Sequence, residues 1–401
     1  MTRRSSSVLK MLGYASTSLG LDGFFRNPGD GRVRPHIPAQ DMIRAQVGGH
    51  LLRVASFHGV ERLVASGSAR GLGASRVFCE DSLAYFNERL SPSGPRLALA
   101  GAAKRAKRNK VFQGQVRIGL AIDGTGVGRC GAQSKVCDLC RPYHDADGKV
   151  IGHRHELVMM TVVGAGLVLP LDAEPYPQGE GELTAGIRLM RRVSAALGPR
   201  FANYVVGDAK YASASFLNAA TEHNLHSVVR LKDNLPDLHG RAVARFNSRP
   251  ADRQIQHDGV TVEIWDDATF QPWEGLSWSS VRVLRYRYAN RKGEVVDAYW
   301  LTDYPPESIG SDALFKLAKS RWEIENQGFN DAKNRYGLEH ICHHDANALL
   351  VGWLLLLLSL VIERLYRLCH LHRGSHQPPS AADLVALLWR ALGLLAVHDT
   401  G

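Results

Sequence analysis

Two apolar runs that each end in an aspartate constrain the fold of this chain most strongly. Val116–Ile122 precedes Asp123, and Tyr204–Gly207 precedes Asp208. Short runs that are rich in valine and isoleucine and free of proline favour β-strands. Two such strands in one sheet bring the acids at their ends together. We therefore expect Asp123 and Asp208 to form part of one site.

The segments around these runs predict the rest of the sheet. Strands are expected at 116–122, 156–163, 166–171, 204–206 and 226–231, and helices at 180–197 and 212–223. The order βββαβαβ is that of the ribonuclease H-like α/β fold, a mixed sheet with flanking helices in which the first and fourth strands are neighbours.

The chain beyond residue 236 has a different pattern. Residues 237–289 show no helical periodicity, and strand-like runs at 260–265, 281–287 and 295–301 predict a β-rich insertion. Residues 347–371 and 380–395 read as two apolar helices that cover the sheet.

A third acid lies on a predicted helix. Residues 320–334 contain no proline and continue the helical run 312–319. Arg321 and Glu325 are four residues apart, so their side chains can touch. We choose Glu325 as the site acid because Glu323 would point elsewhere, and Asp331 is a weaker contender. Trp322, Phe329 and Ala332 are expected to pack against the sheet.

Asp123, Asp208 and Glu325 are therefore predicted to form one catalytic triad. Two divalent cations about 3.5–4 Å apart need oxygen ligands from several carboxylates, and Mg²⁺ (or Mn²⁺) prefers oxygen. The alternative is three unrelated surface acids. The positions of the acids, two after apolar strands and one on an amphipathic helix, favour the metal site.

The basic residues gather at the N-terminal end. Residues 1–110 contain 18 Lys and Arg but only 7 Asp and Glu, which favours binding to nucleic acid over a merely solvated basic face. Five of these residues cluster in a predicted linker: Lys104, Arg105, Lys107, Arg108 and Lys110. Residues 1–35 read as irregular. Helices at 40–65 and 80–90 fit a helix-turn-helix or a plain bundle equally well.

Composition also indicates where in the cell the protein is located. Six cysteines in 401 residues do not suggest a secreted disulfide framework, and the N-terminus lacks the apolar core of a signal peptide. The apolar run 348–362 is short for a membrane span, so we expect a buried helix and a cytoplasmic protein with no membrane partner.

A second metal site is suggested by Cys137 and Cys140. With His153 and His155, these residues could complete a tetrahedral structural Zn²⁺ site. Cys130 is an alternative ligand. The other interpretation is that the cysteines are reduced residues of a β-hairpin loop and bind no metal.

Three motifs carry a resemblance to a known family. Residues 122–125 (Ile-Asp-Gly-Thr), 207–212 (Gly-Asp-Ala-Lys-Tyr-Ala) and 321–334 resemble the catalytic blocks of bacterial insertion-sequence DDE transposases, in the branch with a β insertion before the glutamate. The resemblance spans roughly residues 80–370. It implies that Asp123, Asp208 and Glu325 bind the metals, and that Arg321 and Lys333 contact DNA phosphate near the transposon end.

The match has two departures. Ala318 stands where the family has a tyrosine, and Lys333 lies one residue further from Glu325 than usual. The resemblance also implies a C-x-x-C in the loop after the first strand. A tryptophan of the insertion (265, 273 or 278) would stack on a flipped base, although such residues are more often core.

These observations predict a transposase that cleaves transposon ends and joins them to target DNA. Its partners would be double-stranded DNA, as terminal inverted repeats and target, and a second copy in a homodimer. The alternatives are a non-catalytic repressor and a nuclease without strand transfer. We expect a basic helical DNA-binding region at 1–110, core at 111–236, insertion at 237–305, and C-terminal helices with Glu325 at 306–401.

Overall fold

The N-terminal part of the protein is helical. The structure is a computed structural model that describes residues 6–112, 117–371 and 378–393. Its first elements are α1 (Val8–Thr17), α2 (Asp22–Arg26), α3 (Ala39–Leu51), α4 (Phe57–Leu63), η1 (Val64–Ser68), η2 (Arg70–Leu72), α5 (Glu80–Arg89) and α6 (Ser93–Arg108).

Two predictions for this part are wrong. Residues 1–35 were expected to be irregular, but Ser7 caps α1 through its side chain and Met11, Leu12 and Ala15 are buried on one face. The basic segment 104–110 was expected to be a linker, but it mostly forms the last turns of α6. The many alanines of α6 favour a helix there.

The central sheet has the predicted neighbours. Its elements are β1 (Gly119–Gly131), β2 (Arg141–His144), β3 (Val150–Val163), β4 (Leu169–Pro175), α7 (Glu182–Leu197), β5 (Tyr204–Gly207), η3 (Ala209–Tyr211), α8 (Ala214–Glu222) and β6 (His226–Leu231). β1 pairs antiparallel with β3 and parallel with β5, β3 pairs with β4, and β5 pairs with β6. The core order β4-β3-β1-β5-β6 therefore confirms the ribonuclease H-like topology.

Strand boundaries differ from the prediction at several places, and β3 begins at Val150, six residues earlier than predicted. β1 continues to Gly131, so Asp123 lies within the strand and does not follow its end. The third predicted strand, 166–171, is found at 169–175 as β4. The short strand β2 was not predicted, and residue 116 lies outside the described residues.

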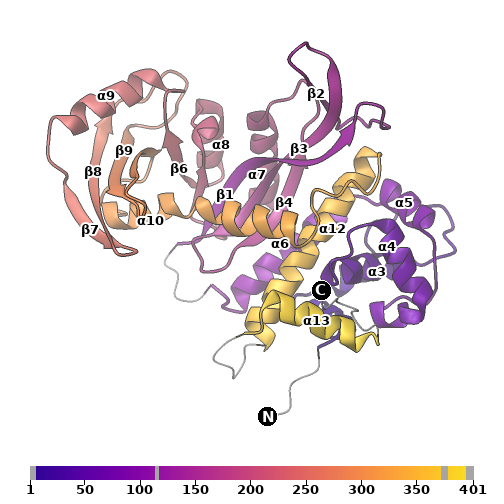
Figure 1. The fold of residues 1–401 in the computed structure, drawn as a ribbon. Helices are drawn as coiled ribbons and strands as arrows, with labels where there is room; N and C mark the ends of the chain where they lie inside the picture. Colours follow the sequence, from indigo (N-terminus) through magenta and orange to yellow (C-terminus); the bar gives the residue numbers. More distant parts are fainter. Residues whose placement is uncertain (1–5, 113–116, 372–377, 394–401) are drawn as a thin grey trace.

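The insertion extends the same sheet. Its elements are α9 (Pro236–Asn247), β7 (Arg253–His257), β8 (Val260–Phe270), β9 (Val281–Ala289) and β10 (Val295–Thr302). β10 pairs with β6, so the insertion strands continue the core sheet toward one edge (Figure 1). The expectation of no helical periodicity at 237–289 is wrong, because Leu238, Ala242 and Phe246 form the buried stripe of α9.

A buried C-terminal helix joins the sheet to the N-terminal helices. The last elements are α10 (Ser311–Lys319), η4 (Ile324–Phe329), α11 (Asn330–Asn334), α12 (Ala346–Leu365), η5 (Tyr366–Leu371) and α13 (Ala381–Ala391). α12 contacts α3, α5, α6 and β4 (Figure 1). The segment Ala346–Leu371 is long and apolar enough to cross a membrane, but 94% of its most apolar window is buried in the protein. The predicted buried helix is confirmed.

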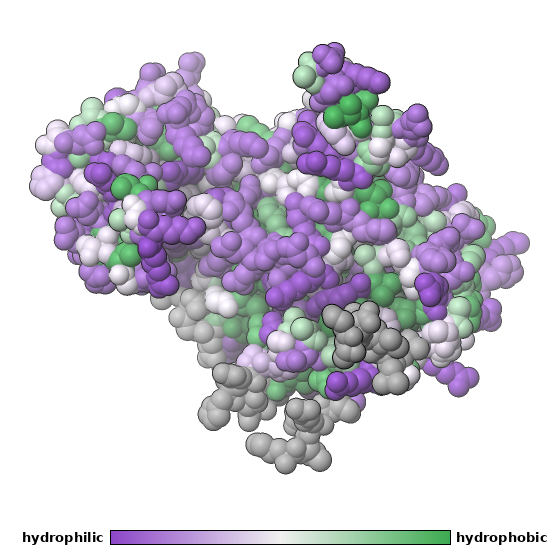
Figure 2. All heavy atoms as spheres, in the orientation of Figure 1, coloured by the Kyte–Doolittle hydropathy of each residue, from purple (hydrophilic) through white to green (hydrophobic). Residues whose placement is uncertain are grey.

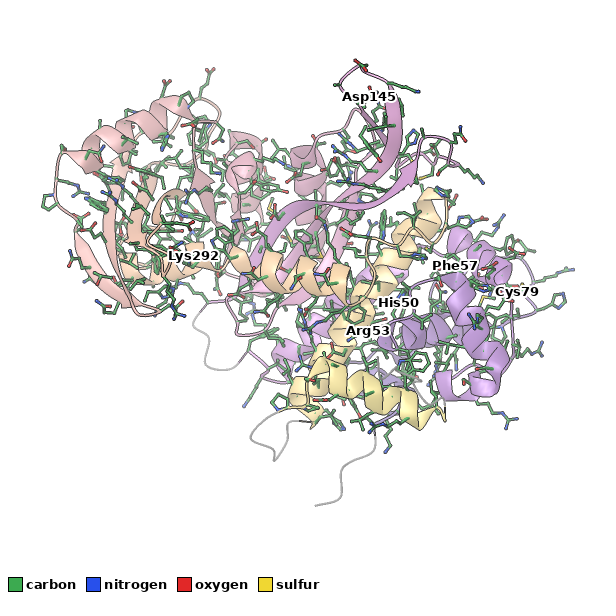
Figure 3. All side chains as sticks on the ribbon, viewed as in Figure 1. His50, Arg53, Phe57, Cys79, Asp145 and Lys292 are labelled. Atoms are coloured by element: carbon green, nitrogen blue, oxygen red, sulfur yellow. The ribbon has the colours of Figure 1, made fainter. Side chains whose placement is uncertain are left out.

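Side chains also connect the two ends of the chain. The Arg53 guanidinium lies 3.8 Å from the Tyr336 ring centroid and 3.8 Å from a Glu363 carboxylate oxygen. Figure 3 places His50 and Arg53 where α3 meets the C-terminal helices. The predicted regions 1–110 and 306–401 thus pack on each other, and their functional division stays a prediction.

Candidate active site

Asp123 and Asp208 come from neighbouring strands of the core sheet. The parallel register pairs Ala121 of β1 with Val206 of β5, so the two aspartates, each two residues further on, lie at the same level. The Asp208 side chain accepts a hydrogen bond of 2.9 Å from the Lys210 N–H, which caps η3 and fixes the carboxylate. The predicted adjacency of these acids follows from the pairing of β1 with β5.

Glu325 reaches the same site from a distorted helix. The predicted continuous helix 312–334 is interrupted by turns at Ser320 and Arg321, and Glu325 lies in the π-helical stretch η4. π-helical turns are rare and frequently mark functional sites. Glu325 and Asp123 share Arg321 as a hydrogen-bond partner, so Glu325 lies on the side of Asp123.

Arg321 links two acids of the predicted triad. Its Nη1 donates to Glu325 Oε1 at 2.8 Å and to Asp123 Oδ2 at 3.3 Å. These two carboxylate oxygens are therefore at most about 6 Å apart. The oxygens of the three acids do not all lie within 4.8 Å of one another. The Arg321 guanidinium therefore lies between Asp123 and Glu325. These two carboxylates would have to come closer together to share a pair of cations.

Buried contacts fix the position of η4. Gly328 lies against β3, where an added Cβ would be 3.1 Å from Met159 Cε. Arg364 of α12 donates to the Gln327 carbonyl and to Asp331. A π-helical turn leaves backbone carbonyls that need other donors, and the buried Arg364 guanidinium supplies one.

The other acids and the tryptophan of this segment point away from the triad. Glu323 accepts a hydrogen bond of 3.1 Å from the Gly164 N–H, and Asp331 pairs with Arg364, so neither replaces Glu325. Trp322 is 44% exposed, so the expectation that it packs against the sheet is wrong. Phe329 and Ala332 are buried as expected.

Burial and neighbouring acids perturb Asp123. Its pKa is raised from 3.8 to about 7, chiefly because burial disfavours the charged carboxylate. Arg321 opposes this rise, while the charges of Asp208, Glu325 and Glu182 add to it. A cation placed among these carboxylates would relieve the repulsion, so the donor set fits an oxygen-preferring divalent metal.

Glu182 is an acid of the site that the sequence interpretation missed. It is the first residue of α7, and its carboxylate lies so close to Gly124 that an added Cβ there would be 2.3 Å from Glu182 Cδ. It binds Lys210 Nζ at 2.7 Å and accepts from the Tyr211 hydroxyl at 3.2 Å. The sequence signal that could have identified Glu182 is its place as the first residue of the helix that follows β4.

Comparison with known proteins gives the family. The family model described as a transposase DDE domain matches residues 114–362, which include all three acids. The chain belongs to the DDE transposase family. A search of curated proteins finds no match.

A solved structure is also similar in part. It is a cryo-EM structure of a piggyBac transposase synaptic complex with hairpin DNA, with 12% sequence identity and a TM-score of 0.43. The similarity covers 100% of this chain and 84% of the other. No property of that protein is inferred for this chain from a similarity at this level.

Lys333 of the transposase lies beside β1. Its Nζ donates to the Gly126 carbonyl at 2.8 Å and pairs with Glu339 at 3.1 Å. It lines a pocket of about 600 Å³ beside β1, whose lining does not include Asp123, Asp208 or Glu325. The other residues of that pocket are Gly126, Gly128, Arg129, Arg154, Glu156 and Glu339.

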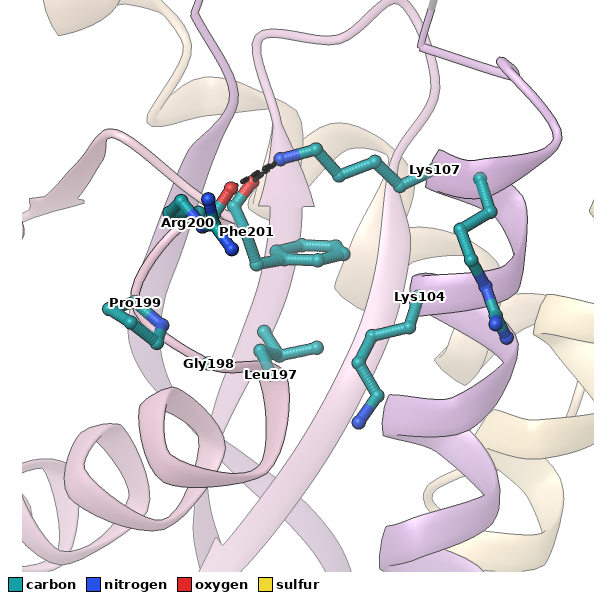
Figure 4. Close-up of a pocket in the computed structure, with 8 residues that line it drawn as sticks. Lys104, Lys107, Leu197, Gly198, Pro199, Arg200 and Phe201 are labelled. Atoms are coloured by element: carbon teal, nitrogen blue, oxygen red, sulfur yellow. Dashed lines mark hydrogen bonds between the residues drawn. The ribbon is translucent and has the colours of Figure 1, made fainter.

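The basic cluster at the end of α6 lies elsewhere. Lys107 Nζ donates to the Arg200 and Phe201 carbonyls (Figure 4). Lys104 Nζ donates to the Ala196 carbonyl at 3.0 Å. These lysines and Arg108 line a pocket of about 700 Å³. Arg105 and Lys110 line a separate pocket of about 550 Å³. Two of the five predicted DNA ligands thus bind backbone carbonyls, and DNA binding by the cluster stays a prediction.

The predicted zinc ligands are only partly brought together. Cys137 Sγ, Cys140 Sγ and His155 Nε2 lie within 4.8 Å of one another, whereas His153 is not in this group. His153 instead faces Cys130 across the β1–β3 pair. The sequence interpretation could not separate the two histidines, because residues two apart on a strand share a face.

The tryptophans of the insertion are mostly core residues. Trp265 and Trp278 are 7% and 8% exposed, and their indole N–H groups donate to the Arg249 carbonyl and the Thr221 hydroxyl. Trp273 is half-buried. Of the predicted base-stacking candidates, Trp273 has the most accessible ring.

Proposed function

We propose that this transposase hydrolyses the DNA at transposon ends and joins the resulting 3′-hydroxyl ends to target DNA. The observation that carries the proposal is that Asp123 of β1 lies level with Asp208 at the end of β5, and that Arg321 bridges Asp123 to Glu325 of η4. Carboxylates held by paired strands and a packed helical segment are suited to phosphodiester chemistry with divalent cations.

The three carboxylates would hold two Mg²⁺ or Mn²⁺ ions. When bound, these ions activate the attacking oxygen and stabilise the leaving oxygen. Asp123 must lose its proton to bind a cation, and its raised pKa makes this loss occur near neutral pH. With cations bound, Asp123 and Glu325 would no longer need the Arg321 guanidinium, which would then be available for a DNA phosphate.

The pocket beside β1 would hold the DNA backbone. Arg129, Arg154 and Lys333 line it, and cationic side chains supply most of the affinity for phosphates. Figure 2 shows that hydrophilic side chains cover most of the face drawn, with a concave outline between the insertion and the β1–β2 hairpin. Double-stranded transposon ends and target DNA would enter along this concave edge, in a complex of two copies of the chain.

A nuclease without strand transfer and a non-catalytic binder are the other candidates. One assay distinguishes these three candidate functions. It uses DNA from the two sides of the gene, where inverted repeats would identify the transposon ends. A labelled duplex with a pre-cut 3′-hydroxyl end is incubated with plasmid and Mg²⁺ or Mn²⁺. Joined product supports the transposase, cut product alone indicates a nuclease, and a gel shift without either indicates a binder.

Variants of the acids complete this experiment. Asp123→Asn, Asp208→Asn and Glu325→Gln should each reduce cleavage and joining by more than about a hundredfold. Glu323→Gln is the matched control, because it lies on the same segment and its amide oxygen can still accept from Gly164. Equal loss in the control and the acid variants would contradict the assignment.

We also propose a structural Zn²⁺ held by Cys137, Cys140 and His155. This set replaces the predicted one, in which His153 was a ligand. The donor types are those that zinc prefers in structural sites. The ion would have no part in the chemistry at Asp123.

A further inference from the structure

We propose that Glu182 is a positioning residue for metal binding at Asp208. Its carboxylate holds the Lys210 ammonium away from Asp208 and fixes the turn that Asp208 caps. The inference rests on the proposed function, because it takes Asp208 to be a ligand of a divalent cation. It gives a role to an acid that lies outside the triad.

Glu182 binds both residues at the end of the turn that follows Asp208. Its Oε2 lies 2.7 Å from Lys210 Nζ, and its Oε1 accepts a hydrogen bond of 3.2 Å from the Tyr211 hydroxyl. The Glu182 side chain is only 11% exposed. Salt and water screen such an ion pair less than they screen a fully exposed pair, so Lys210 is held firmly.

The Tyr211 ring is buried between α7 and β5. An added Cβ at Gly186 of α7 would be 2.6 Å from Tyr211 Cε1, and one at Gly207 of β5 would be 2.9 Å from Tyr211 Cδ2. Two glycines therefore provide the space in which the ring lies, and the hydroxyl at the end of the ring reaches Glu182. These contacts fix the last residue of η3.

The other end of the same turn holds Asp208. The Asp208 Oδ1 accepts a hydrogen bond of 2.9 Å from the Lys210 N–H. Lys210 thus contacts Asp208 through its backbone and Glu182 through its side chain. Among the residues that the structure describes, Asp208 has no ion-pair partner. Its carboxylate therefore keeps its charge available for a cation.

Without Glu182, the Lys210 ammonium could turn to Asp208. Lysine carries its charge on a flexible four-carbon stem, and 63% of the Lys210 side chain is exposed, so the protein around it leaves room for this movement. An ammonium group at Asp208 would repel a divalent cation and compete with it for the carboxylate. Glu182 prevents this competition by pairing with Lys210, and for this role it does not have to touch the metal.

The test is the stabilisation of the full-length protein by Mg²⁺ in thermal unfolding, because a ligand that binds only the folded state raises its stability. Glu182→Gln keeps an oxygen for the Tyr211 hydroxyl but loses the charge that holds Lys210. It should need at least about tenfold more Mg²⁺ than the wild type for the same rise in Tm. Glu180→Gln is the matched control, because its carboxylate binds Arg188 instead, and its response should equal that of the wild type.

A second substitution separates this role from a structural one. Lys210→Met removes the competing cation, so the double variant Glu182→Gln/Lys210→Met should regain most of the lost Mg²⁺ affinity. The Mg²⁺ concentration that gives half-maximal cleavage should recover in the same way. Removal of Lys210 would restore neither a lost metal ligand nor a lost structural contact.

Two results would overturn the inference: a double variant as impaired as Glu182→Gln, or a Glu182→Gln variant that responds to Mg²⁺ as the wild type does. In either case the proposed function still stands if Mg²⁺ stabilises the wild type but not Asp208→Asn. If Mg²⁺ stabilises neither of these two proteins, the metal site at Asp208 is wrong and the role of Glu182 falls with it.

Discussion

Replacing Asp123 by asparagine should make the metal-free protein more stable at alkaline pH. Burial and the acids around it raise the pKa of Asp123 from 3.8 to about 7, with Arg321 opposing the rise. Between these values the folded protein keeps a proton that the unfolded chain has lost. The free energy of unfolding therefore falls as pH rises from about 4 to about 7, and it stays low above that range.

The size of this effect follows from the pKa difference. A change from 3.8 to about 7 corresponds to roughly 4 kcal/mol of stability that ionised Asp123 costs at high pH. Asparagine carries no charge at any pH, so the advantage of Asp123→Asn should grow with pH. Between about pH 5.5 and about pH 8.5 it should increase by roughly 2 kcal/mol.

The assay is urea unfolding in magnesium-free buffer at both pH values. Glu307→Gln is the control, since Glu307 is exposed and should show no such trend. Magnesium should stabilise the wild type at about pH 8.5 and have little effect on Asp123→Asn, because a ligand that binds only the folded state raises its stability. An advantage for Asp123→Asn that does not change with pH would refute the reasoning.

Two further changes test how the Glu325 segment is held. Gly328→Ala places a methyl group 3.1 Å from Met159 Cε, so it should shift the Glu325 segment and slow cleavage, while stability changes by about 1 kcal/mol or less because the end of the Met159 side chain can move. Gly240→Ala is the matched control, because no atom lies within 4 Å of the Cβ that it adds. Its free energy of unfolding in urea should stay equal to that of the wild type or rise. Arg364→Met should cost about 3–5 kcal/mol in the same measurement, because it leaves the partly buried Asp331 without its closest cation. Unchanged stability in Arg364→Met would show that this ion pair does not hold the segment.

The sequence by itself determined the core topology and singled out the three acids of the proposed site. Strand and helix periodicity reports which face of each element is buried, so the order of elements could be read before any contact was known. The pairing of β1 with β5 then followed from that order. The choice of Glu325 over Glu323 also followed locally, because residues two apart on a helix point in different directions.

Tertiary structure alone decided which side chains complete the sites. Glu182 joins the acids because α7 begins beside Gly124, and Arg321 bridges two carboxylates because its segment packs beside β1. Only packing placed His155 against the two cysteines in place of His153. Periodicity records burial within one element, whereas the distance between side chains from different elements depends on how those elements pack.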